Sequence, residues 1–328
     1  MKQRPLHRYE LYGLRVCSEL PLPAPRARGG APCDLTFRLG PREAGPPPLG
    51  DGDEAEVLAH LELWGRPAYT LTANGAGYQF VFHRSGRFLI DAGLRTVEAR
   101  PFDGVRPGMA GLLLVNGVIA ALLALRGEWV LHAGAVAAGG RALVFVGGIG
   151  MGKSTLTAAC CALGGRLLTD DLLRLRPAGP GSWRCFPGTG RLRLREGARP
   201  LAAAFPAAPK RITPDNRLEL TLPGIDPGRP LPELGAVVIP RTSTECTDFR
   251  LTRLPLSRAV TRLMQGLKMQ GMARSRDLQA RLDFAARLAA EVPVFEAEIP
   301  WGLEQLQENA AQLARELGFP LNPKEKTP

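Results

Sequence analysis

A motif typical of phosphate binding lies near the middle of the chain. Residues 147–154 read GGIGMGKS and match G-x-x-x-x-G-K-[ST]. An apolar strand predicted over 142–146 precedes the loop, and a helix predicted over 154–163 follows it. Glycines permit the tight curve in which backbone N–H groups surround a phosphate, and the helix directs its positive end at the same anion. We therefore predict an ATP-binding loop made of Gly147, Gly148, Ile149, Gly150, Met151, Gly152, Lys153, Ser154 and Thr155, the alternative being a glycine-rich turn without a ligand.

Lys153, Ser154 and two aspartates supply the groups that phosphoryl transfer needs. In loops of this type the lysine reaches the β- and γ-phosphates, and the serine hydroxyl binds Mg²⁺. Asp170 and Asp171 lie 17 and 18 residues after Lys153, at the end of a strand predicted over 167–169. One carboxylate at this place can hold the metal while its neighbour accepts a proton from an attacking hydroxyl. The alternative is a strand-end turn with a helix cap, for which aspartate is also suited.

His132 lies in an apolar strand predicted over 129–137, 21 residues before Lys153. A histidine in such a strand, taken alone, is most often a core residue with a satisfied hydrogen bond. His60 and His83 stand alone in the N-terminal half and are read as ordinary surface or core residues.

The residues before the loop predict a β-rich N-terminal domain over 1–107 and a catalytic domain over 108–328. Short alternating segments between proline- and glycine-rich turns are typical of strands. Residues 101–108, with two prolines and two glycines, end this pattern. Because the N-terminal half holds no catalytic set of residues, we expect it to recognise the substrate. The strands are predicted over 9–16, 35–39, 55–64, 68–73, 77–83 and 88–91.

The second half alternates helices and strands. The apolar run 109–125 predicts a buried core helix, because about 17 residues interrupted by Asn116 are at the short limit for a membrane span. Together with the segments around the loop, this alternation predicts an α/β nucleotide-binding layout. Later elements are a strand over 236–239 and helices over 257–270, 275–291 and 302–317.

The composition and charge of the chain indicate which classes of partner it can bind. The net charge of +11, from 42 basic and 31 acidic residues, favours acidic partners. The arginines are scattered, however, and aromatic residues are only 6%, so we expect no nucleic-acid partner. The six cysteines contain no CxxC pair and are expected to be buried thiols in a reducing cytoplasm. With no secretory signal after the N-terminal charges, we expect a cytoplasmic protein with no membrane partner.

Three segments together resemble the bacterial HPr kinase/phosphorylase family: VLHAGAV at 130–136, GGIGMGKST at 147–155 and RLLTDD at 166–171. The resemblance implies an α/β (α+β) core of the HPr kinase and phosphoenolpyruvate carboxykinase type, with a smaller β-rich N-terminal domain. It also implies that His132 lies near the γ-phosphate and that Asp171 accepts the proton of a serine hydroxyl. We assign Asp170, with Ser154, to Mg²⁺. Because the family forms hexamers, the resemblance allows a homo-oligomer.

The segment after this core departs from the family. The family carries a metal-binding glutamate within an Arg-Gly-Leu-Gly signature, which the stretch Phe186–Glu196 lacks. Arg195 stands near the expected place, and Glu196 is the candidate substitute. Arg191 and Arg193 are predicted to be solvated strand charges, with a role at the transferred phosphate as the alternative. The segment linked to phosphorylase activity is not recognisable either, which argues against the reverse reaction and against HPr as the substrate.

These features predict a Mg²⁺- and ATP-dependent serine kinase that acts on a peptide or small protein. Segments 9–22 and 131–135 resemble the divergent HPr-kinase-like proteins found beside ribosomally made peptides, some of which phosphorylate the C-terminal serine of a lasso-peptide precursor. Three alternatives stay open: an ATP-binding or ATP-hydrolysing regulator, a phosphotransferase for a small metabolite, and an HPr-type protein kinase.

Overall fold

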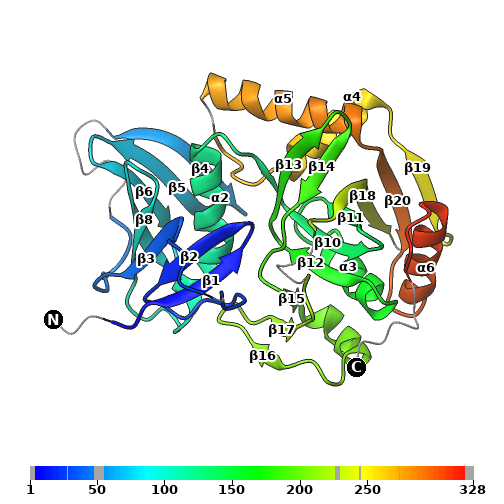
Figure 1. The fold of residues 1–328 in the computed structure, drawn as a ribbon, viewed down its shortest axis with the longest axis horizontal. Helices are drawn as coiled ribbons and strands as arrows, with labels where there is room; N and C mark the ends of the chain where they lie inside the picture. Colours follow the sequence, from blue (N-terminus) through cyan, green and yellow to red (C-terminus); the bar gives the residue numbers. More distant parts are fainter. Residues whose placement is uncertain are drawn as a thin grey trace. The chain divides into compact units, whose positions relative to one another are not determined.

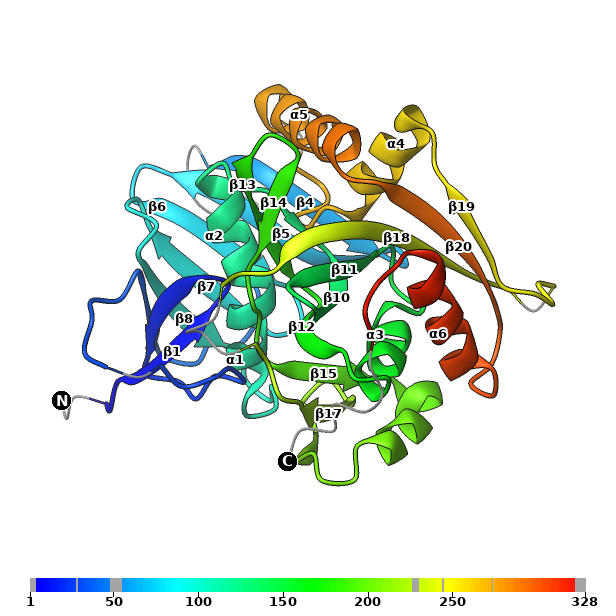
Figure 2. The same cartoon turned by 45° about the vertical axis from the view of Figure 1, so that its right-hand side comes forward.

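The computed structural model describes residues 4–27, 29–47, 55–225, 230–243, 245–272 and 274–321. It divides into two compact units, Met1–Glu128 with Met269–Ala280 and Trp129–Lys268 with Arg281–Pro328. Both contain β-sheet, and helices cover sheets in the second (Figures 1 and 2). The chain therefore has a mixed α/β architecture.

One sheet in the first unit has the strand order β1-β2-β3-β8-β7-β6-β5-β4. Its neighbouring strands are antiparallel, except that β3 is parallel to both β2 and β8. Phe80, Phe88 and Val97 are buried on its apolar face. The strands are β1 (His7–Leu11), β2 (Leu14–Ser18), β3 (Leu35–Leu39), β4 (Glu56–Leu63), β5 (Arg66–Asn74), β6 (Gly77–Phe82), β7 (Gly86–Asp91) and β8 (Thr96–Pro101).

The β1–β2 hairpin replaces the single strand that we predicted over 9–16. Tyr12 and Gly13 have φ values of 55° and 68°, as a two-residue turn between antiparallel strands requires. Bulky residues seldom adopt a positive φ, and Tyr12 is also fully buried, so the sequence pattern did not indicate a turn. We also predicted no strand over 96–101, where β8 lies.

A single buried helical segment follows β8, as predicted for the apolar run 109–125. It consists of α1 (Met109–Leu113), a π-helical turn η1 (Leu114–Val118) and α2 (Ile119–Leu125). A Cβ atom on Gly117 would lie 2.5 Å from the Phe82 ring, so the helix approaches the first unit's sheet closely. The first unit therefore extends to Glu128, whereas we predicted the boundary at 107. In the part of the chain that the structure describes, no helix is both long and apolar enough to cross a membrane.

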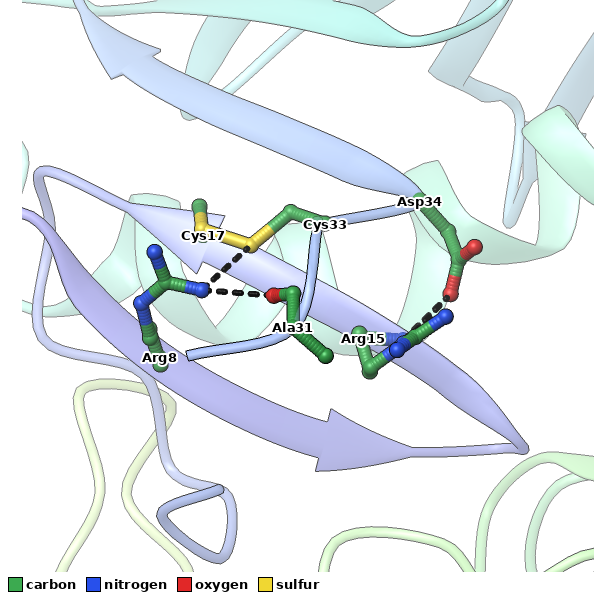
Figure 3. The surroundings of a disulfide bond; sticks show 6 residues. All are labelled: Arg8, Arg15, Cys17, Ala31, Cys33 and Asp34. Atoms are coloured by element: carbon green, nitrogen blue, oxygen red, sulfur yellow. Dashed lines mark hydrogen bonds and ion pairs between the residues drawn. A yellow bond between two sulfur atoms is a disulfide. The ribbon is translucent and has the colours of Figure 1, made fainter. Parts of the chain in front are cut away.

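A disulfide joins Cys17 of β2 to Cys33, which precedes β3 (Figure 3). The guanidinium of Arg8 lies beside it and donates a hydrogen bond to the carbonyl oxygen of Ala31 at 2.7 Å. The parallel pairing of β2 with β3 brings the two cysteines together. The expectation that all six cysteines are free thiols is therefore wrong for this pair. Cys160 is a free buried thiol, as predicted, and burial raises its pKa to about 12.

The main sheet of the second unit has the order β12-β10-β11-β18-β14-β13-β9, and β20 pairs with β18 and β19. Its centre is parallel, because β18 runs parallel to β11 and β20. Val237 and Val238 of β18 are fully buried there. The strands are β9 (Val130–Leu131), β10 (Ala133–Ala138), β11 (Arg141–Val146), β12 (Arg166–Asp170), β13 (Leu173–Gly179), β14 (Ser182–Cys185), β18 (Glu233–Ser243), β19 (Arg250–Arg253) and β20 (Val294–Pro300).

Helices α3 (Lys153–Ala162) and α6 (Leu306–Glu316) lie side by side against this sheet (Figure 2). Leu156 of α3 and Leu313 of α6 share one core cluster with Phe145 of β11. Because α3 is anchored to the strand that precedes it, the loop between them is held at both ends. The other helices are α4 (Leu256–Gly266) and α5 (Ser275–Glu291), and the ends of α3, α4, α5 and α6 lie within four residues of those predicted.

A small antiparallel sheet, β15-β17-β16, lies beside α3 and β12. Leu192, Leu194 and Leu220 are buried on one face, in a cluster with Ala158 and Leu167. Side chains alternate across a strand, so the arginines of β15 and the glutamate of β17 point to the other face. The elements are β15 (Arg191–Leu194), a 3₁₀ helix η2 (Glu196–Ala204), β16 (Lys210–Ile212) and β17 (Leu218–Thr221).

Candidate functional site

The glycine loop connects β11 directly to α3, as the motif predicts. Gly150 and Gly152 have φ values of 87° and 82°, a backbone region that other residues rarely adopt. The Nζ atom of Lys153 donates hydrogen bonds to the carbonyl oxygens of Gly147 and Gly148, both at 2.8 Å. The loop is therefore curved around the ammonium group. This places a positive charge and the first N–H groups of α3 at the same point, which suits a phosphate.

Lys153 is only 7% exposed. Burial lowers its pKa to about 8, and the nearby carboxylates of Asp171 and Asp170 partly oppose the shift. A buried ammonium group is costly without an anionic partner. A bound polyphosphate would supply that partner and stabilise the charged form.

Ser154 and Asp170 are in direct contact. The Ser154 hydroxyl donates to Oδ1 of Asp170 at 2.7 Å, and the backbone N–H of Arg193 donates to Oδ2 at 2.9 Å. Burial raises the pKa of Asp170, since the ionised form is poorly solvated there. A divalent cation beside this pair would offset that cost.

The donor set fits Mg²⁺ bound together with a substrate phosphate. Among the described residues, no three His, Cys, Asp or Glu side chains form a group that could hold a metal. Magnesium is usually held by one or two carboxylates, waters and substrate phosphates, without a cage made only of protein groups. A hydroxyl and one buried carboxylate at the end of a phosphate loop match that requirement.

Asp171 faces two cations and an imidazole ring. Its Oδ1 lies 3.1 Å from Nδ1 of His132 and 3.1 Å from Nζ of Lys268, and its Oδ2 lies 3.1 Å from Nη2 of Arg193. Although burial acts in the opposite direction, Lys268, His132 and Arg193 together hold the pKa of Asp171 well below its usual range. The carboxylate is therefore ionised at neutral pH.

The backbone at Asp171 also turns sharply. Its φ is 96°, an unusual value for a residue other than glycine, and its N–H donates to the carbonyl oxygen of Ala133 at 2.9 Å. This turn directs consecutive carboxylates to different partners, Asp170 to Ser154 and Asp171 to the cations. Backbone strain of this kind persists where the surroundings hold it, often at functional sites.

His132 lies at a break between β9 and β10, inside what we predicted to be one strand. Its backbone N–H leaves the sheet and donates to the carbonyl oxygen of Gly266 at 2.7 Å. Its Nδ1 lies 2.9 Å from the carbonyl oxygen of Asp171 as well as near the carboxylate. Both neighbours are acceptors, so Nδ1 carries the proton. Burial, followed by the charge of Lys268, lowers the pKa of His132 despite Asp171, which leaves the ring neutral with Nε2 as an acceptor.

Arg193 differs from its prediction as a solvated charge. It is 6% exposed and pairs with Asp171, because the pleat of β15 directs it away from Leu192 and Leu194 and onto the polar face of the small sheet. Arg191, on the same face, is half-buried and donates to the hydroxyl of Thr221. The strict alternation of arginine and leucine over 191–194 could have indicated that both arginines share one face of a strand, because such a strand buries its leucines on the other face.

Sequence reasoning missed Lys268, which comes from the segment after α4 and donates its backbone N–H to Val130. No local pattern marks it, because its partner is almost a hundred residues away in the chain. Glu196, the candidate substitute for the family glutamate, is exposed at the start of η2. It is not among the groups that contact Ser154 or Asp170 in the described residues.

The structure thus brings together His132, Lys153, Ser154, Asp170 and Asp171 from three separate segments. Two other residues of the predicted loop, Ile149 and Met151, do not contact this cluster in the described part of the chain. Ile149 is half exposed, and the sulfur of Met151 accepts a hydrogen bond from the N–H of Gly148 at 3.0 Å. The cluster can hold a phosphate, a divalent cation and a fixed anionic group close to one another.

Comparisons with known proteins add little. No family model matches the sequence, and no curated protein matches it. Among solved structures, one match is the HPr(Ser) kinase/phosphatase from Coxiella burnetii, with a TM-score of 0.27 and 12% sequence identity over 57% of this chain and 94% of that chain. A TM-score this low does not establish a shared fold.

Proposed function

We propose that this chain is a Mg²⁺- and ATP-dependent kinase that transfers the γ-phosphoryl group of ATP to a serine hydroxyl. One observation carries the proposal: the glycine loop lies beside two consecutive carboxylates, one buried and one partly buried, that have different partners. Asp170 contacts Ser154, and Asp171 is surrounded by cations. A protein that only bound phosphate would need neither carboxylate, because each repels the ligand.

Ser154 and Asp170 would hold a magnesium ion, which neutralises charge on the phosphate oxygens when it is bound. Lys153 would bind the β- and γ-phosphate oxygens, and the curve at Gly150 and Gly152 directs backbone N–H groups to the same oxygens. Gly147 and Gly148, which now accept from Lys153, keep its ammonium group at that place.

Asp171 would accept the proton of the attacking hydroxyl. The hydroxyl oxygen bonds to the γ-phosphorus, the bond from that phosphorus to the β–γ bridging oxygen breaks, and ADP leaves. A carboxylate offers about four acceptor positions, and His132, Lys268 and Arg193 occupy three of them. His132, Lys268 and Arg193 orient Asp171, and the charges of Lys268 and Arg193 keep it ionised and neutralise charge that develops near the transferred group.

We propose a peptide or small protein as the acceptor, with the C-terminal serine of a lasso-peptide precursor favoured. The resemblance of segments 9–22 and 131–135 to HPr-kinase-like proteins of that kind supports this choice. The first unit would select the acceptor, because the glycine loop, Asp170 and Asp171 all belong to the second unit.

The test incubates the protein with Mg²⁺, ATP and synthetic peptides that carry serine either internally or at the C-terminus. Mass spectrometry should detect one added phosphoryl group per peptide, and the product should disappear in Asp171→Asn. The replacement of Lys210 by methionine, on an exposed strand, is a control for the loss of a lysine charge. Nucleotide binding that is equal in the wild type and in Lys153→Met would contradict the proposal. Binding without any product would favour the regulator instead.

A further inference from the structure

A pocket in the second unit lies next to the Asp171 cluster but outside the phosphate loop. It is lined by Arg195 and Glu196, which follow β15, and by Asp215, Asn216 and Arg217 in the turn between β16 and β17. The function proposed above uses none of these residues.

The wall of the pocket is a firmly built turn. Thr213 is 3% exposed, and its N–H donates to the carbonyl oxygen of Arg217 at 2.9 Å. Its hydroxyl accepts from the backbone N–H of Arg217 at 3.0 Å and also contacts Asp215. Asn216 has a φ of 60°, which asparagine tolerates better than most residues. The turn therefore presents the Arg217 side chain in a defined place.

A chain of alternating charges links the pocket to Asp171. Arg193 contacts Asp171 through Nη2 at 3.1 Å and Asp215 through Nη1 at 3.7 Å. The same Asp215 carboxylate lies 3.1 Å from Nε of Arg217. Only one guanidinium and one carboxylate thus separate the pocket from Asp171, the proposed proton acceptor. A single substrate molecule could therefore contact the pocket and Asp171 at the same time.

The pocket is lined by two arginines and two carboxylates, and one of these carboxylates also pairs with Arg193 outside the pocket. Asp215 is shared between Arg193 and Arg217. Arg195 has an exposed side chain and makes no ion pair with any residue that the structure describes. The pKa of Arg217 is lowered, first by burial and next by the charge of Arg193, which indicates that its cationic form is under-compensated. Two guanidinium groups beside an open pocket are suited to an oxyanion.

We propose that this pocket binds an oxyanion, a carboxylate or a phosphate, that the acceptor carries near the hydroxyl to be phosphorylated. Arg217 and Arg195 are its specificity-determining residues. The inference deepens the kinase proposal and depends on it for the identity of the acceptor, but the anion site can be tested by itself.

The probe is inorganic phosphate, titrated by calorimetry into protein saturated with Mg²⁺ and a non-hydrolysable ATP analogue. We expect one binding event in the presence of the analogue. Loss of a charge-assisted hydrogen bond costs about 1.5–3 kcal/mol, so Arg217→Gln and Arg195→Gln should each weaken phosphate binding about tenfold or more. The affinity for the analogue should stay the same.

The matched control is Arg250→Gln. Arg250 on β19 has a 75% exposed side chain paired with Glu298 at 3.7 Å, so its replacement removes one positive charge far from the pocket. Phosphate binding should not change. Circular dichroism and thermal unfolding verify that each variant is folded, and Arg217→Lys, which keeps the charge, should restore part of the affinity.

Three results would overturn the pocket proposal: no phosphate binding beside the bound analogue, equal weakening by Arg250→Gln, or a parallel loss of analogue affinity in Arg217→Gln. The last would assign the pocket to the nucleotide. If the wild type fails to bind the analogue at all, the kinase proposal fails, and phosphate titration without nucleotide still tests the pocket.

Competition identifies the source of the anion. A serine peptide with a free C-terminal carboxylate should displace phosphate from the pocket, and the amidated peptide should not, if the acceptor is recognised by its C-terminus. If neither peptide competes while phosphate binding still depends on Arg217, the pocket accepts a phosphate group of the acceptor. Displacement by both peptides to the same extent would contradict oxyanion recognition.

Discussion

The two units of the protein differ in the groups that surround their partly buried histidines and charges. In the first, the Thr70 hydroxyl lies 2.9 Å from Nδ1 of His60 and 2.8 Å from Nε2 of His83. Burial and the neighbouring His60 lower the pKa of His83, so it is neutral at neutral pH. In the second, Lys153, Asp170 and Arg193 are all less than 10% exposed. The first unit also holds ion pairs, of Glu43 with Arg87 and Arg100, but only the second gathers such charges beside the glycine loop.

This difference favours the second unit as the place of the proposed chemistry. Burying an ionised group is expensive, and replacing buried ion pairs by apolar residues is often neutral or stabilising. A cluster of buried charges therefore adds little to the stability of the fold and is more typical of a reactive site. His60 and His83, which we read as isolated residues, share a hydroxyl and belong to the architecture of the first sheet.

Within the second unit the consecutive carboxylates also differ. Burial raises the pKa of Asp170, and Lys268, His132 and Arg193 lower that of Asp171. Groups whose environments push their pKa values apart have separate roles. The comparison between the units, and between these two carboxylates, can be tested by the changes below.

The largest effect is expected for Asp171→Asn. Removal of a general base reduces the rate of transfer by about 10²–10⁴-fold. Nucleotide affinity should be kept, because Asp171 contacts His132, Lys268 and Arg193 and not the loop. Single-turnover phosphorylation and calorimetric nucleotide binding separate the two quantities. An equal loss of affinity and rate would contradict the distinct roles of the two carboxylates.

Lys153→Met should lower kcat/KM for ATP by about 10²–10³-fold, since one preorganised donor at the phosphates is lost. The ammonium also holds the carbonyl oxygens of Gly147 and Gly148, so nucleotide affinity should fall together with the rate. Equilibrium dialysis with ATP checks this, with Lys210→Met as the control. In Lys153→Met the first unit should unfold at the same denaturant concentration as in the wild type.

Cys33→Ala should affect the first unit alone. The disulfide closes a loop with a sequence separation of 16, for which the loss of a cross-link costs about 3 kcal/mol. Hydrogen exchange in β2 and β3 should speed up, and ATP affinity should not change. If ATP affinity fell as well, the separation of structural and chemical roles between the units would be wrong.

ATP binding should weaken above about pH 8. The pKa of Lys153 is lowered from 10.5 to about 8, so the free protein loses this charge as the pH rises through that value. Affinity should fall by up to tenfold per pH unit, and Lys153→Met should show no such slope. The folded state binds this proton less well than the unfolded state. The same lysine should therefore make the free energy of unfolding rise between about pH 8 and 10.5.

The smallest effect is expected for Thr70→Val. Removing the hydroxyl that His60 and His83 share leaves two partly buried ring nitrogens without this partner, which costs about 1–3 kcal/mol of stability. Chemical denaturation measures this loss. Transfer activity should not change, and a change of more than a few-fold would show that the first unit participates in the chemistry.

Local sequence predicted the parts of the site that are contiguous in the chain. The loop 147–155, the strand before it and α3 were all predicted, because glycine conformations and apolar spacing act over a few residues. The break at His132 and the positive φ of Asp171 were not predicted. Both depend on hydrogen bonds to Gly266 and Ala133, which are distant in sequence or lie in another strand.

By itself, the sequence predicted the glycine loop and the two carboxylates that lie near it. The tertiary structure decided how those carboxylates differ, through Arg193 from β15 and Lys268 from the segment after α4. It also decided the Cys17–Cys33 pair and the hairpin at Tyr12. The physical reason is range: backbone sterics act between neighbours, whereas burial and Coulomb interactions depend on which segments packing brings together.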